Sequence, residues 1–154
     1  MNLENKRTTP ISGEEADDIG RKLLSWFNQN ASLPDGVKRI NYIYLEDDKP
    51  GMMLSPIQGA YKIEQDITGN YTAQYQFELM YRSQPTNNGE RISMDQGLNS
   101  LADWAAGQEQ KPDLGAGISS IEINRATIAT FFNRYENGDE DHHILMEMVY
   151  TGTE

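Results

Sequence analysis

Two histidines stand beside three carboxylates near the C-terminus, in the run DEDHH from Asp139 to His143. Carboxylate oxygens and imidazole nitrogens are the usual ligands of calcium and of transition metals, so this run could hold a metal ion or carry acid–base chemistry. Its spacing does not fit either use. Histidines that bind zinc from a helix stand four residues apart, whereas these two are neighbours. In a strand, neighbouring side chains point to opposite faces and cannot hold one ion together.

The residues before the histidines predict a turn. Asn137–Gly138 is among the strongest short signals for a β-hairpin, and we interpret the acids Asp139, Glu140 and Asp141 as a solvated loop at its tip. Calcium at these carboxylates remains an open alternative, although they do not alternate as in an EF-hand loop and no bidentate glutamate follows at the right distance. The other acidic triplet, at 46–48, precedes KPG and also predicts a turn.

Other catalytic signatures are missing from the sequence. The serines lack a GxSxG context, and the glycine cluster GAG at 115–117 lacks the GK[ST] of a phosphate loop. The chain has no cysteine, which excludes a thiol nucleophile and cysteine-bound zinc. The sequence therefore predicts a protein that is not an enzyme, with no catalytic, cofactor-binding or metal-binding residue and no cofactor.

Composition narrows the class of partner. The 154 residues include 24 Asp and Glu against 13 Lys and Arg, for a formal net charge of -11. Such a surface repels polyphosphates, and sequence-specific DNA binding is not expected. The N-terminus lacks the apolar core of a signal peptide, and no apolar run approaches the length of a membrane span. We expect a soluble protein of a cytoplasm-like compartment, unless it travels as part of a particle.

Helical spacing appears first near the N-terminus. Ser12 and Glu15 have the spacing of a capping box, and apolar residues then recur at steps of three and four, which predicts an amphipathic helix over 13–29. A second amphipathic helix is predicted over 91–107. We expect an N-terminal tail over residues 1–11 and one domain over 12–154, as the length suggests.

The remaining segments show strand periodicity. Short strands are predicted over 37–46, 52–59 and 60–67, and the clearest strand spans 71–83. Its alternation places one set of side chains on a buried face: Tyr71, Ala73, Tyr75, Phe77, Leu79 and Tyr81.

The segment 107–117 reads as a mobile linker, and 119–152 as two strands joined by the turn at 137–138. The predicted fold class is α+β, with a mostly antiparallel β-sheet, two amphipathic helices packed on one face and a long C-terminal β-hairpin.

Tyrosine is overrepresented, with eight tyrosines against four phenylalanines. Tyrosine suits half-buried strands and is also enriched at protein–protein interfaces, so an exposed set would fit a subunit that works by contact. A cytoplasmic α+β domain with a tyrosine-lined pocket under the helices, binding a small molecule, is the alternative.

The order of elements resembles a family of phage proteins. The phrases are YQFELMYRS, the helix LNSLADWA, the strand SIEINRATIATFF, the turn ENGDE and the closing strand ILMEMVYTG. Together they resemble the tail terminators, or minor capsid (neck) proteins, of long-tailed phages of Gram-positive bacteria, over about residues 13–152. The resemblance implies a non-enzymatic protein of the virion neck, assembled in the host cytoplasm. Other phage roles, as a tail-tube or head-closure subunit, stay open.

The resemblance also implies partners. Proteins of this family form a homo-oligomeric ring, usually of six subunits, that caps the tail tube and joins it to the head-closure connector, while DNA passes through the lumen without specific binding. Ring closure needs two different complementary patches on each subunit. We predict that the loops at 83–90 and 107–117 and the hairpin tip supply them. The predicted interface residues are Arg82, Asn87, Asn88, Arg91, Asn137, Asp139, Glu140 and Asp141.

Overall fold

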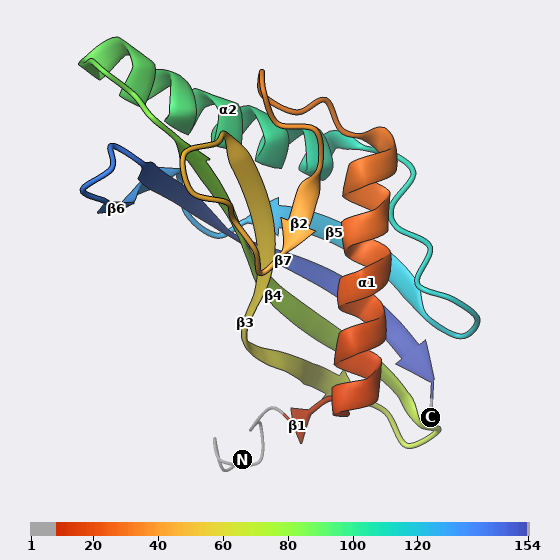
Figure 1. Ribbon diagram of the computed structural model, residues 1–154. Coiled ribbons are helices and arrows are strands. Elements are labelled where there is room, and N and C mark those ends of the chain that lie inside the picture. The colour runs from red at the N-terminus through yellow and green to blue at the C-terminus, as the bar shows by residue number, and fades with distance from the viewer. Residues whose placement is uncertain (1–8, 154) are drawn as a thin grey trace.

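The computed structural model describes residues 9–153 and confirms the α+β class (Figure 1). Two helices accompany a sheet that has seven strands within this range. In chain order the elements are β1 (Thr9–Pro10), α1 (Gly13–Asn30), β2 (Ile40–Tyr42), β3 (Gly51–Gln65), β4 (Asn70–Ser83), α2 (Asn88–Gly107), β5 (Ser119–Arg125), β6 (Thr130–Arg134) and β7 (Glu140–Thr153). No helix in the described range is both long and apolar enough to cross a membrane.

The sheet is built around three long strands, β3, β4 and β7. The main order is β1–β3–β4–β7–β5, with β2 also paired to β3 and β6 also paired to β7. All these pairs are antiparallel except β2 with β3, which is parallel. The predicted terminal hairpin is confirmed, but its first arm is split into β5 and β6. Between them Ala126 donates its backbone N–H to the carbonyl of Leu145 at 2.7 Å.

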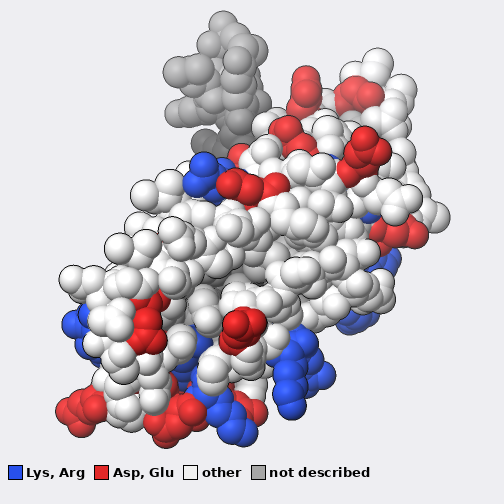
Figure 2. Space-filling view, turned by 90° about the horizontal axis from the view of Figure 1, so that it is seen from above, with Lys and Arg blue, Asp and Glu red and all other residues white. Residues whose placement is uncertain are grey.

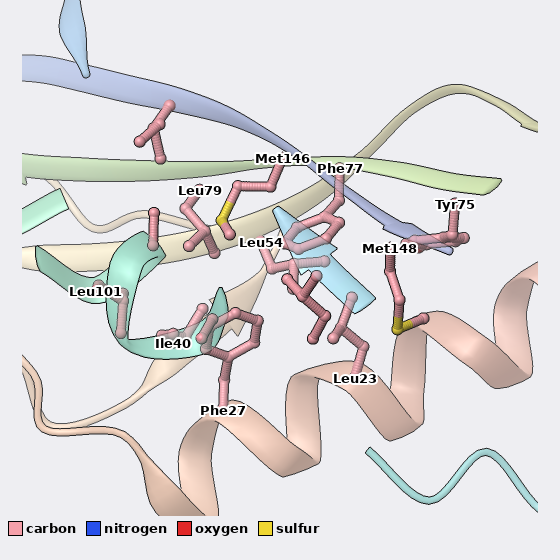
Figure 3. Close-up of a cluster of buried hydrophobic side chains, with 14 of the residues drawn as sticks. Leu23, Phe27, Ile40, Leu54, Tyr75, Phe77, Leu79, Leu101, Met146 and Met148 are labelled. Atoms are coloured by element: carbon pink, nitrogen blue, oxygen red, sulfur yellow. The ribbon is translucent and has the colours of Figure 1, made fainter. Parts of the chain in front are cut away.

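Both helices pack on one face of the sheet, as the two amphipathic patterns predicted. The alternate residues of β4 that were assigned to the buried face are all buried, and they join α1, α2 and β7 in one core. In Figure 3, Leu23 and Phe27 of α1 point toward Leu54 and Phe77 of the sheet. The Phe27 and Phe77 rings meet edge to face with centroids 6.1 Å apart. Apolar and aromatic side chains thus fill the space under the helices.

At the start of α1, the Ser12 side chain makes its capping-box hydrogen bond, but the Glu15 side chain has other partners. The Ser12 hydroxyl accepts the backbone N–H of Glu15 at 3.1 Å. The Glu15 carboxylate, however, accepts hydrogen bonds from the hydroxyls of Tyr71, at 2.5 Å, and Tyr150, at 2.8 Å. Its side chain therefore ties the first turn of α1 to β4 and β7. Burial and the neighbouring Glu15 carboxylate raise the pKa of Tyr150 well above its ordinary value, so this hydroxyl stays a donor.

Gly152 offers a test of this packing. A Cβ at this position would lie 2.4 Å from the Tyr71 ring, which is buried and hydrogen-bonded to Glu15. Gly152→Ala should therefore lower the free energy of unfolding by about 1–3 kcal/mol, the usual cost of overpacking. Urea denaturation measures the change. Gly13→Ala is the matched control, because nothing lies within 4 Å of its Cβ. Equal stability of the two variants would contradict a fixed Tyr71 ring.

Several boundaries differ from the prediction. The two short strands expected over 52–67 form one strand, β3, whose pairing with β4 shifts at two irregularities. The strand expected over 37–46 is limited to β2, after which Ile43 adopts a positive φ of 49°. Of the expected N-terminal tail, residues 1–8 lie outside the described residues, whereas Thr9–Pro10 pairs with β3 and Ile11 is buried.

The segment expected to be a mobile linker, 107–117, is fastened to α1. Lys22 donates from Nζ to the carbonyl of Leu114 at 3.1 Å, and the Trp26 indole N–H donates to the carbonyl of Gln110 at 3.2 Å. Leu114 is 1% exposed and belongs to the core. Beyond α2 the segment is a connection without helix or strand, as predicted, but it is anchored to α1 and to the core, which its Gly- and Pro-bearing composition did not reveal.

Candidate functional site at the hairpin tip

The three acids at the hairpin tip are buried. Asp139, Glu140 and Asp141 are each 1% exposed, and Glu140 is already the first residue of β7. The turn itself is present, since the N–H of Tyr135 donates to the carbonyl of Asp139 at 2.8 Å and Gly138 has a φ of +96°. The interpretation of the triplet as a solvated loop is wrong. Carboxylates are buried only with cationic or hydrogen-bonding partners, and each of these has its own set.

Asp141 is held by Arg82 of β4, its cross-strand neighbour. The guanidinium donates from Nε to Oδ1 at 2.7 Å and from Nη2 to Oδ2 at 2.9 Å, a bidentate pair that is almost wholly buried. The Tyr135 hydroxyl also donates to Asp141, at 2.9 Å, and the Arg82 guanidinium lies 4.9 Å from the centre of the Tyr135 ring. The hydrogen bond to Asp141 raises the pKa of Arg82 above its ordinary value, although burial opposes it.

Glu140 collects three cationic or protonatable partners from three elements. Arg91 of α2 and Arg134 of β6 donate to Oε2 at 3.1 and 3.0 Å. Oε1 lies 2.8 Å from Nε2 of His142. Burial alone would raise the pKa of Glu140, but the bonds from His142, Arg134 and Arg91 outweigh it and hold that pKa at about 2. Glu140 thus joins α2, β6 and β7 as a charged carboxylate.

Asp139 links the hairpin tip to the other acidic turn. Its carboxylate accepts from Gln84 at 3.0 Å, from Asn137 at 2.8 Å and from the backbone N–H of Asp48 at 3.1 Å. Burial would raise the pKa of Asp139, and these hydrogen bonds lower it overall. The turn at 46–48 adds Asp47, which lies 3.3 Å from Arg82. The two acidic triplets of the sequence therefore meet around one buried arginine.

The histidines lie on opposite faces of the sheet, as predicted for neighbours in a strand. His142 faces α2, where Nδ1 lies 2.6 Å from Asp95 of that helix. His143 faces the other side, where Nδ1 lies 2.8 Å from Glu78 of β4. Carboxylates only accept, so both contacts of His142 are hydrogen bonds when its ring carries two protons. Within residues 9–153, no group of His, Asp and Glu side chains has the arrangement of a metal site.

The structure gathers the predicted interface residues at one end of the sheet. Six of them belong to one hydrogen-bonded network: Arg82, Arg91, Asn137, Asp139, Glu140 and Asp141. The other two begin α2. Asn87 is its N-cap and accepts the N–H of Glu90 at 2.9 Å, and Asn88 is its exposed first residue. The sequence thus identified one connected region, but many of these side chains are occupied within the subunit.

Large apolar side chains are exposed at both edges of the same region. At one edge Tyr42, Ile43 and Tyr44 are 44%, 53% and 56% exposed. At the other edge lies an apolar cluster that the sequence analysis missed: Ile128, Phe131 and Phe132. The two phenylalanines belong to β6, and all five residues of that strand are exposed. Neighbouring side chains in a strand point to opposite faces, and the helices cover only one face of this sheet, so the pair Phe131–Phe132 was the available signal.

Comparison with known proteins gives one kind of match. No protein-family model and no curated protein sequence matches the chain. Among solved structures, it is similar to a chain of the structure titled "Virion of native gene transfer agent (GTA) particle", with a TM-score of 0.63. The match covers 92% of this chain and 100% of the other, at 12% sequence identity. The two chains share a fold. At this identity, function does not follow from the fold alone.

Proposed function

We propose that this protein is a non-enzymatic structural subunit of a phage-like virion. The observation that carries the proposal is the similarity to a chain of a gene transfer agent virion, which extends over 92% of this chain and the whole of that chain. The packed space under the helices supports it over the small-molecule alternative, because the tyrosines there contact Glu15 and each other. The protein resides in the virion and needs no cofactor.

The finer role that we propose is that of a tail terminator. The subunit forms a ring of six copies that caps the tail tube and joins it to the head-closure connector, as the resemblance in sequence implies. The net charge of -11 supports a lumen through which DNA passes without binding, since like charges repel. Figure 2 shows the acidic and basic side chains on one face of the molecule, and Asp and Glu predominate over the upper half of this view.

The hairpin tip has two parts in this proposal. Exposed residues make contact with the neighbouring protein, while the buried ones hold the tip in shape for it. The first group comprises Asn87, Asn88 and Asn137, and the second comprises the buried Arg82, Asp139, Glu140 and Asp141 with the half-buried Arg91. Contacts with the tail tube or connector come from the first group, since its side chains reach the surface.

Assembly of the purified protein tests the role. Light scattering across a concentration series, with negative-stain images, should show closed rings of uniform mass, either alone or on added tail tubes. Open-ended tubes would instead indicate a tail-tube subunit, because a terminator stops at one ring. A monomer that neither assembles nor joins tail tubes would contradict the virion role and favour a small-molecule-binding domain, for which ligand-induced thermal stabilisation is the readout.

A further inference from the structure

The segment Tyr42–Tyr44 exposes apolar surface on a strained backbone. Ile43 has a φ of 49°, a left-handed conformation that a β-branched residue rarely adopts. Such a conformation is unfavourable for the isolated chain and is found more often at functional sites. The three side chains of this segment are each about half exposed. An arrangement that is costly to the monomer and exposes two tyrosines is typical of a contact surface.

The opposite edge of the sheet carries the second apolar surface. β6 is the outer strand beside β7 and lies at the left in Figure 1, whereas β2 lies near α1. Phe131 and Phe132 are 48% and 49% exposed, and Ile128 just before them is 62% exposed. The Phe132 ring packs against His143, with centroids 4.9 Å apart, which fixes its direction. The Phe131 ring packs in the same way against His142, with centroids 5.9 Å apart, so the apolar surface covers both faces of the outer strand β6.

The two surfaces lie at the same level along the strands. One row of paired residues crosses the sheet from Ile40 through Met52, Tyr81 and His142 to Phe131. The ends of this row are β2 and β6, next to the two apolar surfaces. Copies joined edge to edge along this row would add sideways, and a head-to-tail contact of that kind closes into a ring when the rotation permits.

Charges around the two surfaces are complementary. Tyr44 shares a surface hollow of about 380 Å³ with Lys38, Arg39 and Lys49. Lys49 is paired with Glu46, but Lys38 and Arg39 form no ion pair within residues 9–153. At the other edge, Glu136 lies two residues beyond the end of β6, is exposed and likewise forms no ion pair within that range. An acidic side chain at one edge thus matches a basic hollow at the other.

We propose that a second copy of this chain docks its β6 edge on the Tyr42–Tyr44 edge, with Glu136 of one copy entering the hollow of Lys38 and Arg39 of the next. The inference rests on the proposed ring and names its subunit contact. The contact is made by side chains. The outward N–H and C=O of Ile40 already bond the Asn28 amide, at 2.7 and 2.9 Å, so β2 offers no free backbone there for sheet extension.

The absence of native cysteine makes disulfide trapping a direct test. Tyr44→Cys and Phe132→Cys are made as separate variants, mixed in the assembled state and oxidised. We expect a mixed dimer to form at least about 10-fold faster than from Ile67→Cys with Phe132→Cys, because docking raises the effective concentration of the thiols. Ile67 is fully exposed in the β3–β4 turn and serves as the matched control.

A charge exchange tests the second half of the contact. Glu136→Lys should weaken assembly several-fold, and adding Lys38→Glu should restore it. If the wild type forms rings but trapping is no faster than in the control and the exchange restores nothing, the edge assignment is wrong while the ring stands. If the wild type stays monomeric alone and on tail tubes, and no mixed dimer forms, both the proposed function and this contact are overturned.

Discussion

Asp141→Ala is expected to lower the free energy of unfolding by about 3–5 kcal/mol, the cost of leaving a buried charge unpaired. Arg82 would then keep its charge beside the exposed Asp47, the backbone carbonyl of Glu46 and the Tyr135 ring, without a buried anionic partner. The total free energy of unfolding of a small domain is about 5–15 kcal/mol, so this loss would be a large share of it. Urea denaturation followed by the fluorescence of Trp26 and Trp104 measures the loss.

Two further variants separate the ion pair from its site. In Arg82→Met with Asp141→Leu neither charge remains, so most of the lost stability should return. Arg125→Ala removes a surface pair with Asp103 and should change stability by less than about 1 kcal/mol. If Asp141→Ala were no more damaging than Arg125→Ala, the hairpin tip would have to be open to water, contrary to its 1% exposure.

The parts of the fold that were predicted correctly depend on local patterns. The apolar residues of α1 recur at helical spacing, and those of β4 alternate with polar residues at strand spacing. Both patterns can be read from a short window of sequence. The turn at Asn137–Gly138 is likewise local, because it depends on a positive φ that glycine adopts freely.

The burial of the hairpin tip could not be predicted in that way. Asp141 pairs with Arg82, which is 59 residues away in the sequence, and Glu140 pairs with Arg91, which is 49 residues away. A run of acids beside a turn is usually solvated, and only the cross-strand pairing of β4 with β7 reverses that expectation. The sequence does contain a weak signal, since Arg82 continues the polar face of β4 at the end where that strand meets the hairpin.

Glu15 shows a different limit. Its spacing from Ser12 predicted a reciprocal cap, but the hydroxyls of Tyr71 and Tyr150 compete for the same carboxylate. Those tyrosines are 56 and 135 residues away, so the competition appears only in the folded chain. The capping-box spacing therefore predicted the start of α1 correctly but predicted the wrong hydrogen-bond partner for the Glu15 side chain.

Acid should destabilise the protein mainly through Glu140. Its pKa is about 2 when folded, below the ordinary value of 4.5, so the folded state favours the charged carboxylate. This stabilisation is fully present above about pH 5 and is lost as the pH falls toward 2. A shift of this size corresponds to roughly 3 kcal/mol when the whole titration is completed. The lowered pKa of Asp139 acts in the same direction.

Glu140→Gln provides the test because it keeps the size of the side chain and removes the charge. Urea denaturation at pH 7 and pH 3 should show the wild type losing roughly 2 kcal/mol more than the variant over this interval. At pH 7 the variant should already be the less stable, since Arg91, Arg134 and His142 lose their anionic partner. Glu109→Gln, at an exposed position two residues beyond α2, should keep the wild-type pH dependence. Parallel curves for Glu140→Gln and the wild type would show that the three partners do not hold a charged carboxylate, and that acid acts on the fold through other groups.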